Sequence, residues 1–313
     1  MKKLKFAICL LMLPALLMAQ EAKRKFVGAC PASTESIARK PGPTRIMIIG
    51  AHPDDADIVC GCFAIRQIER GCKVKFVSVT DGRMGHHRLT PEETARTRRA
   101  ETIEAAKRMN LDGYDIYGYP DCGLYPTKEA RELVAREIRK YEPDFVITHR
   151  TIDYHADHRA TGQLVMDAGY LLGVPNWCSD VKAQRRRPVI LYMSDKFTFP
   201  RELRPDVMID AEPYFDKWCD GLDAQVSQFY DWLPWDRGDT KAVEALGDRS
   251  DIKARNKFLI SRTAGRKRND AKRFANDWKA MYPGKSVPNF MEAFEVSEYG
   301  RAPTADDFKL LGL

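Results

Sequence analysis

The sequence predicts an α/β fold, with a Rossmann-like, mostly parallel sheet, helices on both of its faces and a helical C-terminal elaboration. From residue 45 onwards, short apolar segments alternate with amphipathic segments of helical period, which is typical of parallel strands joined by crossover helices. The polar residues of the first half gather directly after the apolar segments, where sites form in such sheets. Past residue 211 we expect helices and no further strands.

Each expected element follows from this alternation. Strands are predicted at 45–50, 73–79, 114–119, 144–148, 188–193 and 206–209, with helices at 57–70, 91–109, 127–141 and 159–172. The helix from 91 has a clear beginning, because Thr90, Pro91 and two glutamates supply a cap, a proline and an acidic first turn. Two longer helical stretches are expected at 212–232 and 251–281. The absence of a repeat or flexible linker favours one domain, with a separate helical domain from about 212 as the alternative.

The N-terminal residues are set apart from this domain. Three lysines precede a charge-free apolar run at 6–19, which is shorter than the roughly 20 residues that a membrane span needs. We therefore expect a signal peptide at 1–19, an N-terminal segment at 20–43 and the main domain at 44–313. This predicts export to the periplasm or beyond in a bacterium, without stable membrane insertion after cleavage. An uncleaved anchor is the alternative.

Composition excludes several classes of function. Lys and Arg number 51 against 44 Asp and Glu, and no basic run interleaved with aromatic residues indicates a nucleic-acid partner. Seven of the eight cysteines lie beyond the signal, an odd number that does not suggest a disulfide framework. Cys60 and Cys62 lie in an apolar stretch and are expected in the core. The motif GxGxxG is absent after the first strand, which argues against a dinucleotide-dependent oxidoreductase. The oligomeric state is not predicted.

Two histidine and aspartate motifs follow the first and fourth strands. His52, Asp54 and Asp55 form one, and His155, Asp157 and His158 form the other. Two imidazoles and a carboxylate, with positions left for water, are typical of catalytic zinc, although Fe²⁺ suits the same donors. One of the two adjacent aspartates could bind the metal while the other serves as general base. The alternative is that this pair only caps a helix.

These motifs resemble the zinc-dependent de-N-acetylases of the PIG-L or LmbE-like family. The resemblance rests on AHPDDAD at 51–57, TDGRMG at 80–85 and PDFVITHRTIDYHADHRATG at 143–162, and weaker matches span nearly the whole mature chain. It implies zinc ligation by His52, Asp55 and His158, with Asp54 as the general base. His155 would polarise the carbonyl or protonate the leaving amine, and Asp157 would orient an imidazole. Asp121 and Arg98 match positions that look like sugar-hydroxyl contacts.

Several residues depart from the family pattern or have no assigned role. His86 and His87 are additional, and we expect them to be solvent-exposed, with substrate contact as the alternative. His149 is either a partner of the metal ligands or a polar strand end. Gln225 stands where relatives commonly have His. The aromatic residues Phe229, Tyr230, Trp232 and Trp235 could stack on a sugar or pack a helix onto the sheet.

The expected reaction is hydrolytic removal of an acetyl group from an N-acetylated amino sugar that resembles an N-acetylglucosaminide. The partner would be a small amino sugar or a glycan. Two alternatives remain open: a broader metal-dependent amidase that acts on a non-sugar or conjugate amide, and a secreted glycan-binding protein without catalysis. Asp54 and His155 together argue against the latter, because binding alone needs neither.

Overall fold

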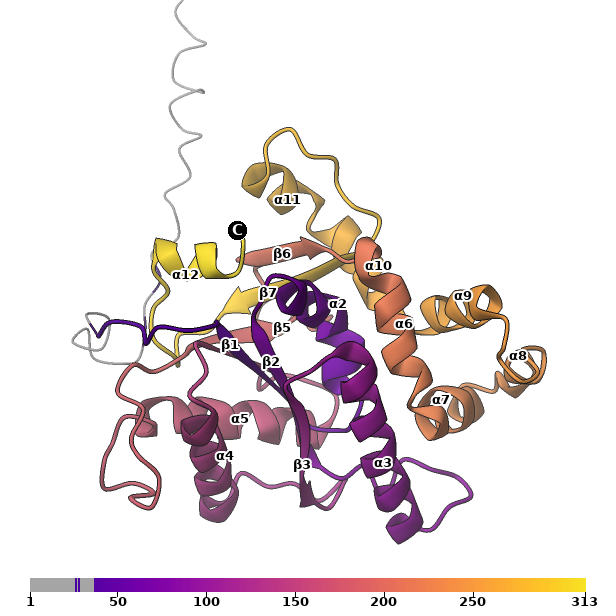
Figure 1. Ribbon diagram of the computed structural model, residues 1–313, viewed down its shortest axis with the longest axis horizontal. Coiled ribbons are helices and arrows are strands. Elements are labelled where there is room, and N and C mark those ends of the chain that lie inside the picture. The colour runs from indigo at the N-terminus through magenta and orange to yellow at the C-terminus, as the bar shows by residue number, and fades with distance from the viewer. Residues whose placement is uncertain (1–25, 27, 29–36) are drawn as a thin grey trace, which may run out of the picture.

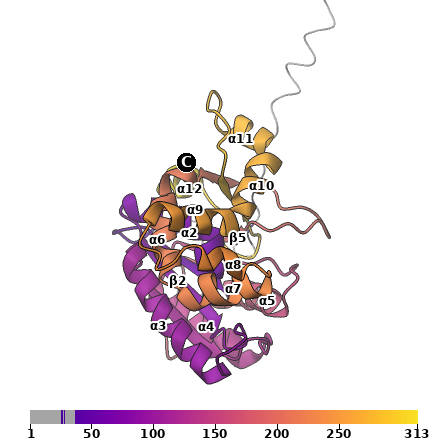
Figure 2. The same ribbon diagram turned by 90° about the vertical axis from the view of Figure 1, so that its right-hand side faces the viewer.

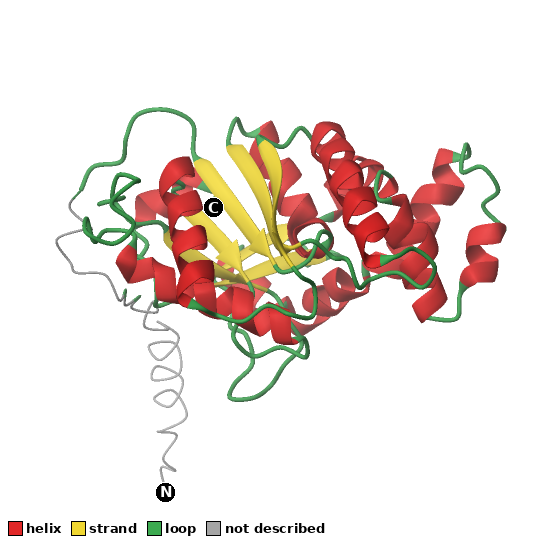
Figure 3. Cartoon of the chain, turned by 90° about the horizontal axis from the view of Figure 1, so that it is seen from below, coloured by secondary structure: helices red, strands yellow, loops and turns green. Residues whose placement is uncertain are grey.

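A computed structural model describes residues 26, 28 and 37–313, so the expected signal peptide lies outside the described residues. The predicted α/β class is confirmed: a mixed seven-stranded sheet carries helices on both faces (Figures 1 and 3). Its order is β3-β2-β1-β4-β5-β7-β6, and β1 to β5 run parallel. The strands are β1 (Arg45–Gly50), β2 (Lys73–Thr80), β3 (Gly113–Tyr119), β4 (Phe145–Thr148), β5 (Val189–Met193), β6 (Val207–Asp210) and β7 (Met291–Val296).

Strand β7 corrects the expectation that no strand follows residue 211. It lies antiparallel between β5 and β6, and all six of its residues are buried. Two glutamates interrupt its apolar pattern, and both have cationic partners. Glu292 Oε1 lies 2.6 Å from Lys267 Nζ, and Arg201 Nη1 donates to Glu295 Oε2 over 2.9 Å. Buried charge needs such partners, and no local sequence pattern announces them.

The helices cover the sheet in two layers whose cores follow the alternation of side chains along each strand. Ile46 and Ile48 of β1 face one core, and Met47 and Ile49 face the other. Helices α2 (Asp55–Glu69) and α6 (Phe215–Asp223) contribute to the first core, where Cys60 and Cys62 are fully buried as expected. Helices α4 (Lys128–Tyr141) and α5 (Ala156–Leu171) contribute to the second, and α3 (Pro91–Met109) packs beside α6 (Figure 1).

The C-terminal half is more broken than the two long helices expected from the sequence. The first stretch divides into a 3-10 turn η2 (Glu212–Tyr214), α6, a π-helical segment η3 (Ser227–Trp232) and α7 (Leu233–Asp236). The rest comprises α8 (Thr240–Glu244), α9 (Ile252–Thr263), α10 (Gly265–Arg273), α11 (Ala275–Met281) and α12 (Ala305–Leu310). Helices α6 to α9 group at one side of the sheet (Figure 2). Within the described ranges, no helix combines the length and apolar character that crossing a bilayer requires.

Candidate metal centre and catalytic site

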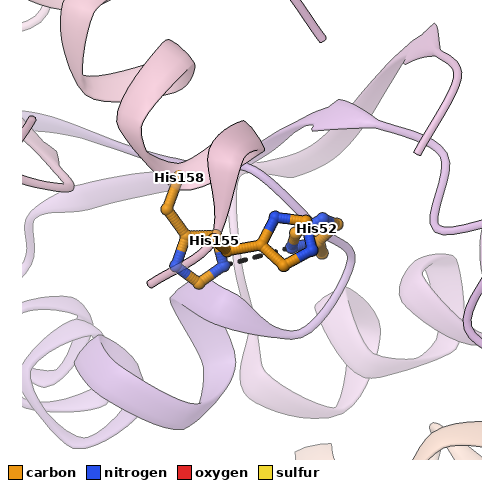
Figure 4. A group of neighbouring side chains, drawn as sticks. All are labelled: His52, His155 and His158. Carbon is orange, nitrogen blue, oxygen red and sulfur yellow. Dashed lines mark hydrogen bonds between the residues drawn. The ribbon is translucent and has the colours of Figure 1, made fainter. Parts of the chain in front are cut away.

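The two histidine motifs meet at the carboxyl edge of the sheet. His52 follows β1, and His155 and His158 lie at the beginning of α5, which follows the neighbouring strand β4. His52 Nδ1 lies 3.2 Å from His158 Nε2, and the ring centroids of His52 and His155 are 4.5 Å apart (Figure 4). Residues about a hundred positions apart therefore share one site, as the parallel sheet predicts.

Three residues, His52, Asp55 and His158, bring donor atoms to distances that suit a small metal ion, with Asp55 contributing both of its oxygens. His52 Nδ1 is 3.5 Å from Asp55 Oδ2, and His158 Nε2 is 3.3 Å from Asp55 Oδ1. The two imidazoles are in contact through His52 Nδ1 and His158 Nε2, which lie 3.2 Å apart. Metal–ligand distances near 2.0–2.1 Å in a tetrahedron place donors about 3.3 Å apart. This donor set therefore fits zinc. The same residues also group closely with His149 and His155.

The backbone and a third imidazole hold Asp55 in place. Its Oδ2 accepts hydrogen bonds from the amides of Ala51 (2.9 Å) and His52 (2.8 Å). His149 Nε2 lies 3.3 Å from the same oxygen, and its ring stacks on His158 at 4.2 Å. Burial opposes ionisation, but the neighbouring His158 and His149 hold the pKa of Asp55 well below its usual value. His149 is thus a partner of the donor set and not merely a polar strand end.

Carboxylates face the other nitrogen of both imidazoles in this set. His52 Nε2 lies 3.1 Å from Asp121 Oδ1 and 3.3 Å from Asp157 Oδ2, and His158 Nδ1 lies 3.0 Å from Asp153 Oδ1. Such carboxylates fix the orientation of a metal-binding imidazole and increase its basicity. Asp153 is absent from the sequence prediction. Its position five residues before His158 is the one feature of the sequence that points to it.

Asp54 stays outside the donor set and lines the cavity above it. Although it occupies the N-cap position of α2, its side chain makes no capping hydrogen bond, so helix capping does not explain it. Instead, the Gln228 side-chain amide donates to Asp54 Oδ2. Burial, together with the charge of Asp55, raises the pKa of Asp54 above its usual value.

His155 has a defined tautomer when neutral. Its Nδ1 accepts a hydrogen bond from the Asp157 amide over 3.2 Å at the beginning of α5, which leaves the proton on Nε2. Burial, followed by the charges of His52 and His158, lowers the pKa of His155. At neutral pH the ring can therefore offer an N–H donor to a bound oxygen.

The cavity over these residues has a volume of about 280 Å³. Asp121 and Arg98 line it together with the two histidine motifs. The Arg98 side chain is buried, and its Nη2 donates to the Gly85 carbonyl over 2.8 Å. Gln225 is fully buried and does not line the cavity.

The expectation of solvent exposure for His86 and His87 is wrong. Their side chains retain only 2% and 14% of their exposed area. Both pack near Asp231 of η3, which closes the loop after β2 against the C-terminal helices. The four aromatic residues of this region have different surroundings. Phe229 and Tyr230 are buried in the core, whereas Trp232 lines the cavity and Trp235 is half exposed.

The chain is thus an α/β protein with a candidate metal site, formed by histidine and aspartate side chains at the carboxyl edge of its parallel strands. Residues 47–169 match the family model described as PIG-L: GlcNAc-PI de-N-acetylase. The predicted resemblance to the PIG-L or LmbE-like family is confirmed over this region of the chain.

Two curated relatives are deacetylases. A diacetylchitobiose deacetylase of Thermococcus kodakarensis is 28% identical over 138 residues, which cover 42% of this chain and 52% of the relative. A 1D-myo-inositol 2-acetamido-2-deoxy-alpha-D-glucopyranoside deacetylase of Kineococcus radiotolerans is 26% identical over 179 residues, with 44% and 50% covered. The chain thus spans about half the length of the curated relatives it matches.

Solved structures support the same fold. The N,N'-diacetylchitobiose deacetylase of Pyrococcus horikoshii superposes with a TM-score of 0.62 at 21% identity, over 88% of this chain and 93% of that one. A 4-carboxy-2-hydroxymuconate hydratase of Pseudomonas putida, GalB, reaches 0.60 at 16% identity, over 83% and 98%. Because proteins with this fold catalyse different reactions, the side chains of the site determine which activity the fold supports.

Proposed function

We propose that the protein is a zinc-dependent hydrolase that removes the acetyl group from an N-acetylated amino sugar. The observation that carries this proposal is one cavity that combines a three-donor metal set with a carboxylate, Asp54, outside that set. Both curated relatives named above act on N-acetylated sugars, which favours that substrate class. His52, Asp55 and His158 would hold the metal. Two imidazoles and one carboxylate are typical ligands of catalytic zinc, with Fe²⁺ as the alternative metal.

A metal held by these residues would supply Lewis acidity and make the attacking water more acidic. The protein supplies the proton acceptor, because Asp54 takes a proton from the attacking water. Burial raises the pKa of Asp54, which makes it a stronger base than an exposed aspartate. The Gln228 amide holds Asp54 Oδ2, so that the carboxylate faces the cavity in one orientation.

His155 acts on the carbonyl side of the amide. The N–H at its Nε2 can donate a hydrogen bond to the carbonyl oxygen as negative charge develops there. Loss of one such donor costs about 10²–10³ in kcat in comparable sites. Asp54 then passes the proton that it took from water to the leaving amine, so that both side chains end in their starting protonation states. Asp121 and Arg98 line the same cavity and would contact the sugar.

The decisive experiment compares Asp54→Asn with the wild-type protein and with Asp306→Asn, an exposed control on α12. Acetate release from N-acetylglucosaminides should fall by about 10²–10⁴ in Asp54→Asn, with one zinc per chain retained in all three proteins. The control should match the wild type. Full activity of metal-free protein, or of Asp54→Asn, would contradict the proposal.

The same assay separates this function from its main alternative. A broader amidase would hydrolyse non-sugar acetamides with comparable kcat/KM, so a panel of both substrate types belongs in the experiment. We further propose export through a signal at 1–19, on the strength of the lysines followed by the apolar run. N-terminal sequencing of the mature protein tests whether it begins at Gln20.

A further inference from the structure

Four aromatic rings form a continuous column beside the cavity. His86 stacks on His87 with centroids 5.2 Å apart and planes 8° apart, and His87 stacks on Trp235 at 4.6 Å and 3°. Trp235 in turn stacks on Trp232 at 5.4 Å and 25°. The column joins the loop after β2 to η3 and α7, which are distant in sequence. Of its four rings, Trp232 alone lines the cavity.

The far end of the column is anchored by polar contacts. His86 Nδ1 accepts from the amides of Arg88 and Leu89, both at 3.1 Å, so the proton of the neutral ring lies on Nε2. That nitrogen lies 3.2 Å from Asp231 Oδ2, and Arg88 also donates to Asp231. Burial lowers the pKa of His86, which favours the neutral ring. The column is thus fixed before any ligand arrives.

The size of the cavity limits what it can enclose. About 280 Å³ lies just below the range of about 300–1,000 Å³ for ligand sites, so it suits a single sugar ring and little more. Any further part of a substrate must extend along the rim. Trp232, Leu233 and Asp236 supply the part of the lining that comes from the C-terminal half, together with Gln228.

We infer that Trp232 is the stacking platform for a second pyranose ring, which is attached to the N-acetylated ring held over the metal donors. This inference rests on the proposed function and adds a substrate requirement to it. The flat, weakly polar face of a sugar ring complements an indole face, and a nearby carboxylate such as Asp236 can accept hydrogen bonds from the sugar hydroxyls. Trp235 stacks on Trp232, and His87 stacks on Trp235, so both are positioning residues for the Trp232 ring.

The rigidity of the column matters for affinity. Holding a side chain in its binding orientation before association removes the entropy cost of ordering it in the complex. Removing Trp235 or His87 should therefore weaken binding of the second ring without changing the chemical step. This distinguishes the column from groups that touch the reacting amide.

The test measures acetate release from the methyl glycoside of N-acetylglucosamine and from N,N'-diacetylchitobiose. In the disaccharide either ring can lose its acetyl group, and the other is then the second ring. We expect Trp232→Ala to lower kcat/KM for the disaccharide about tenfold more than for the monosaccharide, and Trp232→Phe to restore much of the difference. His87→Ala and Trp235→Ala should raise KM for the disaccharide and leave its kcat unchanged. Phe199→Ala, which removes an exposed ring that does not line the cavity, should match the wild type on both.

Equal losses on the two substrates in Trp232→Ala would overturn the inference, as would a wild type that does not prefer the disaccharide. Inactivity of the wild-type protein on every N-acetylated sugar would instead count against the proposed function. Zinc content and the thermal unfolding temperature are measured for each variant, so that a loss of activity caused by misfolding is recognised.

Discussion

Each imidazole of the donor set uses its two nitrogens differently. His158 turns Nε2 to Asp55 and Nδ1 to Asp153, whereas His52 turns Nδ1 to the set and Nε2 to Asp121 and Asp157. The carboxylates decide which nitrogen of each ring remains available for a metal. Asp121 thus contacts His52 as well as lining the cavity where the sequence predicts sugar contact.

Removal of Asp153 should therefore weaken metal binding without removing a ligand. We expect Asp153→Ala to reduce zinc affinity by 10- to 100-fold, because His158 loses the partner of its Nδ1. Competition with a chromogenic chelator measures this change. Asp180→Ala, which removes an exposed carboxylate paired with Arg136, is the control and should bind zinc as tightly as the wild type. Unchanged affinity in Asp153→Ala would show that the contact has no such role.

The sequence places the main residues of the site together but not all of their partners. His52, Asp55 and His158 meet because carboxyl ends of neighbouring parallel strands share an edge, which hydrophobic periodicity is enough to predict. Asp153 and His149 reach the same cluster through the irregular segment after β4, which follows no period. Burial of His86 and His87 was missed for the same reason, since their partners Asp231 and Trp235 lie in a distant segment.

Among the elements, the π-helical segment η3 connects the C-terminal half to the carboxyl edge of the parallel strands. It presents Gln228 to Asp54, Asp231 to His86 and Trp232 to the cavity. Glu101 of α3 fastens its beginning, because the Ser227 amide and hydroxyl donate to the two Glu101 oxygens over 2.7 and 2.6 Å. Such wide helical turns are rare and often occur at functional sites.

Ser227→Ala should destabilise the protein by about 1.5–3 kcal/mol, because a partly buried hydrogen bond to a carboxylate is lost. Urea unfolding measures the change. Ser261→Ala offers a comparison, since that exposed hydroxyl donates to the Phe258 carbonyl of its own helix and accepts from Arg262 but contacts no carboxylate, and its cost should be clearly smaller. If the two variants lose equal stability, Glu101 does not fasten η3 in the way described.

The sequence predicts this region as one helix over 212–232, and the structure divides it. Apolar spacing does not distinguish 3-10, α- and π-helical turns, because their periods differ by less than a short segment resolves. The early helices are matched closely by comparison. The helix expected at 91–109 has the same bounds in the structure, where Thr90 and Glu93 complete a capping box.

At the scale of the molecule, a buried ion pair holds the last helix to the sheet. Arg301 contacts Asp307 of α12 through two hydrogen bonds of 2.7 and 2.8 Å, and both side chains are almost fully buried. Burial alone would raise the pKa of Asp307, but the hydrogen bonds from Arg301 and Thr304 outweigh it and lower the pKa. The ionised form therefore stabilises the folded state.

Because folding lowers the pKa of Asp307, the stability of the protein should depend on pH. The contribution of Asp307 is complete above the unfolded carboxyl pKa of about 4 and is lost as the pH falls through the lower folded value. The difference in unfolding free energy between wild type and Asp307→Asn should thus be largest near pH 7 and shrink below about pH 4. Asp306→Asn, on the same helix but exposed, should show little difference at any pH. Chemical denaturation across this range decides, and a constant difference would contradict the assignment.

The position of β7 also has a consequence for the order in which the chain can fold during synthesis. Strands β1 to β5 leave the ribosome in sequence and can pair as they emerge, whereas β6 has no neighbour until β7 arrives from beyond α11. Until then, β5 exposes an unpaired edge, and Lys267 lacks its partner Glu292. Nascent chains stalled before Met291 should therefore be sensitive to proteases and prone to association, since late long-range pairing leaves strand edges exposed.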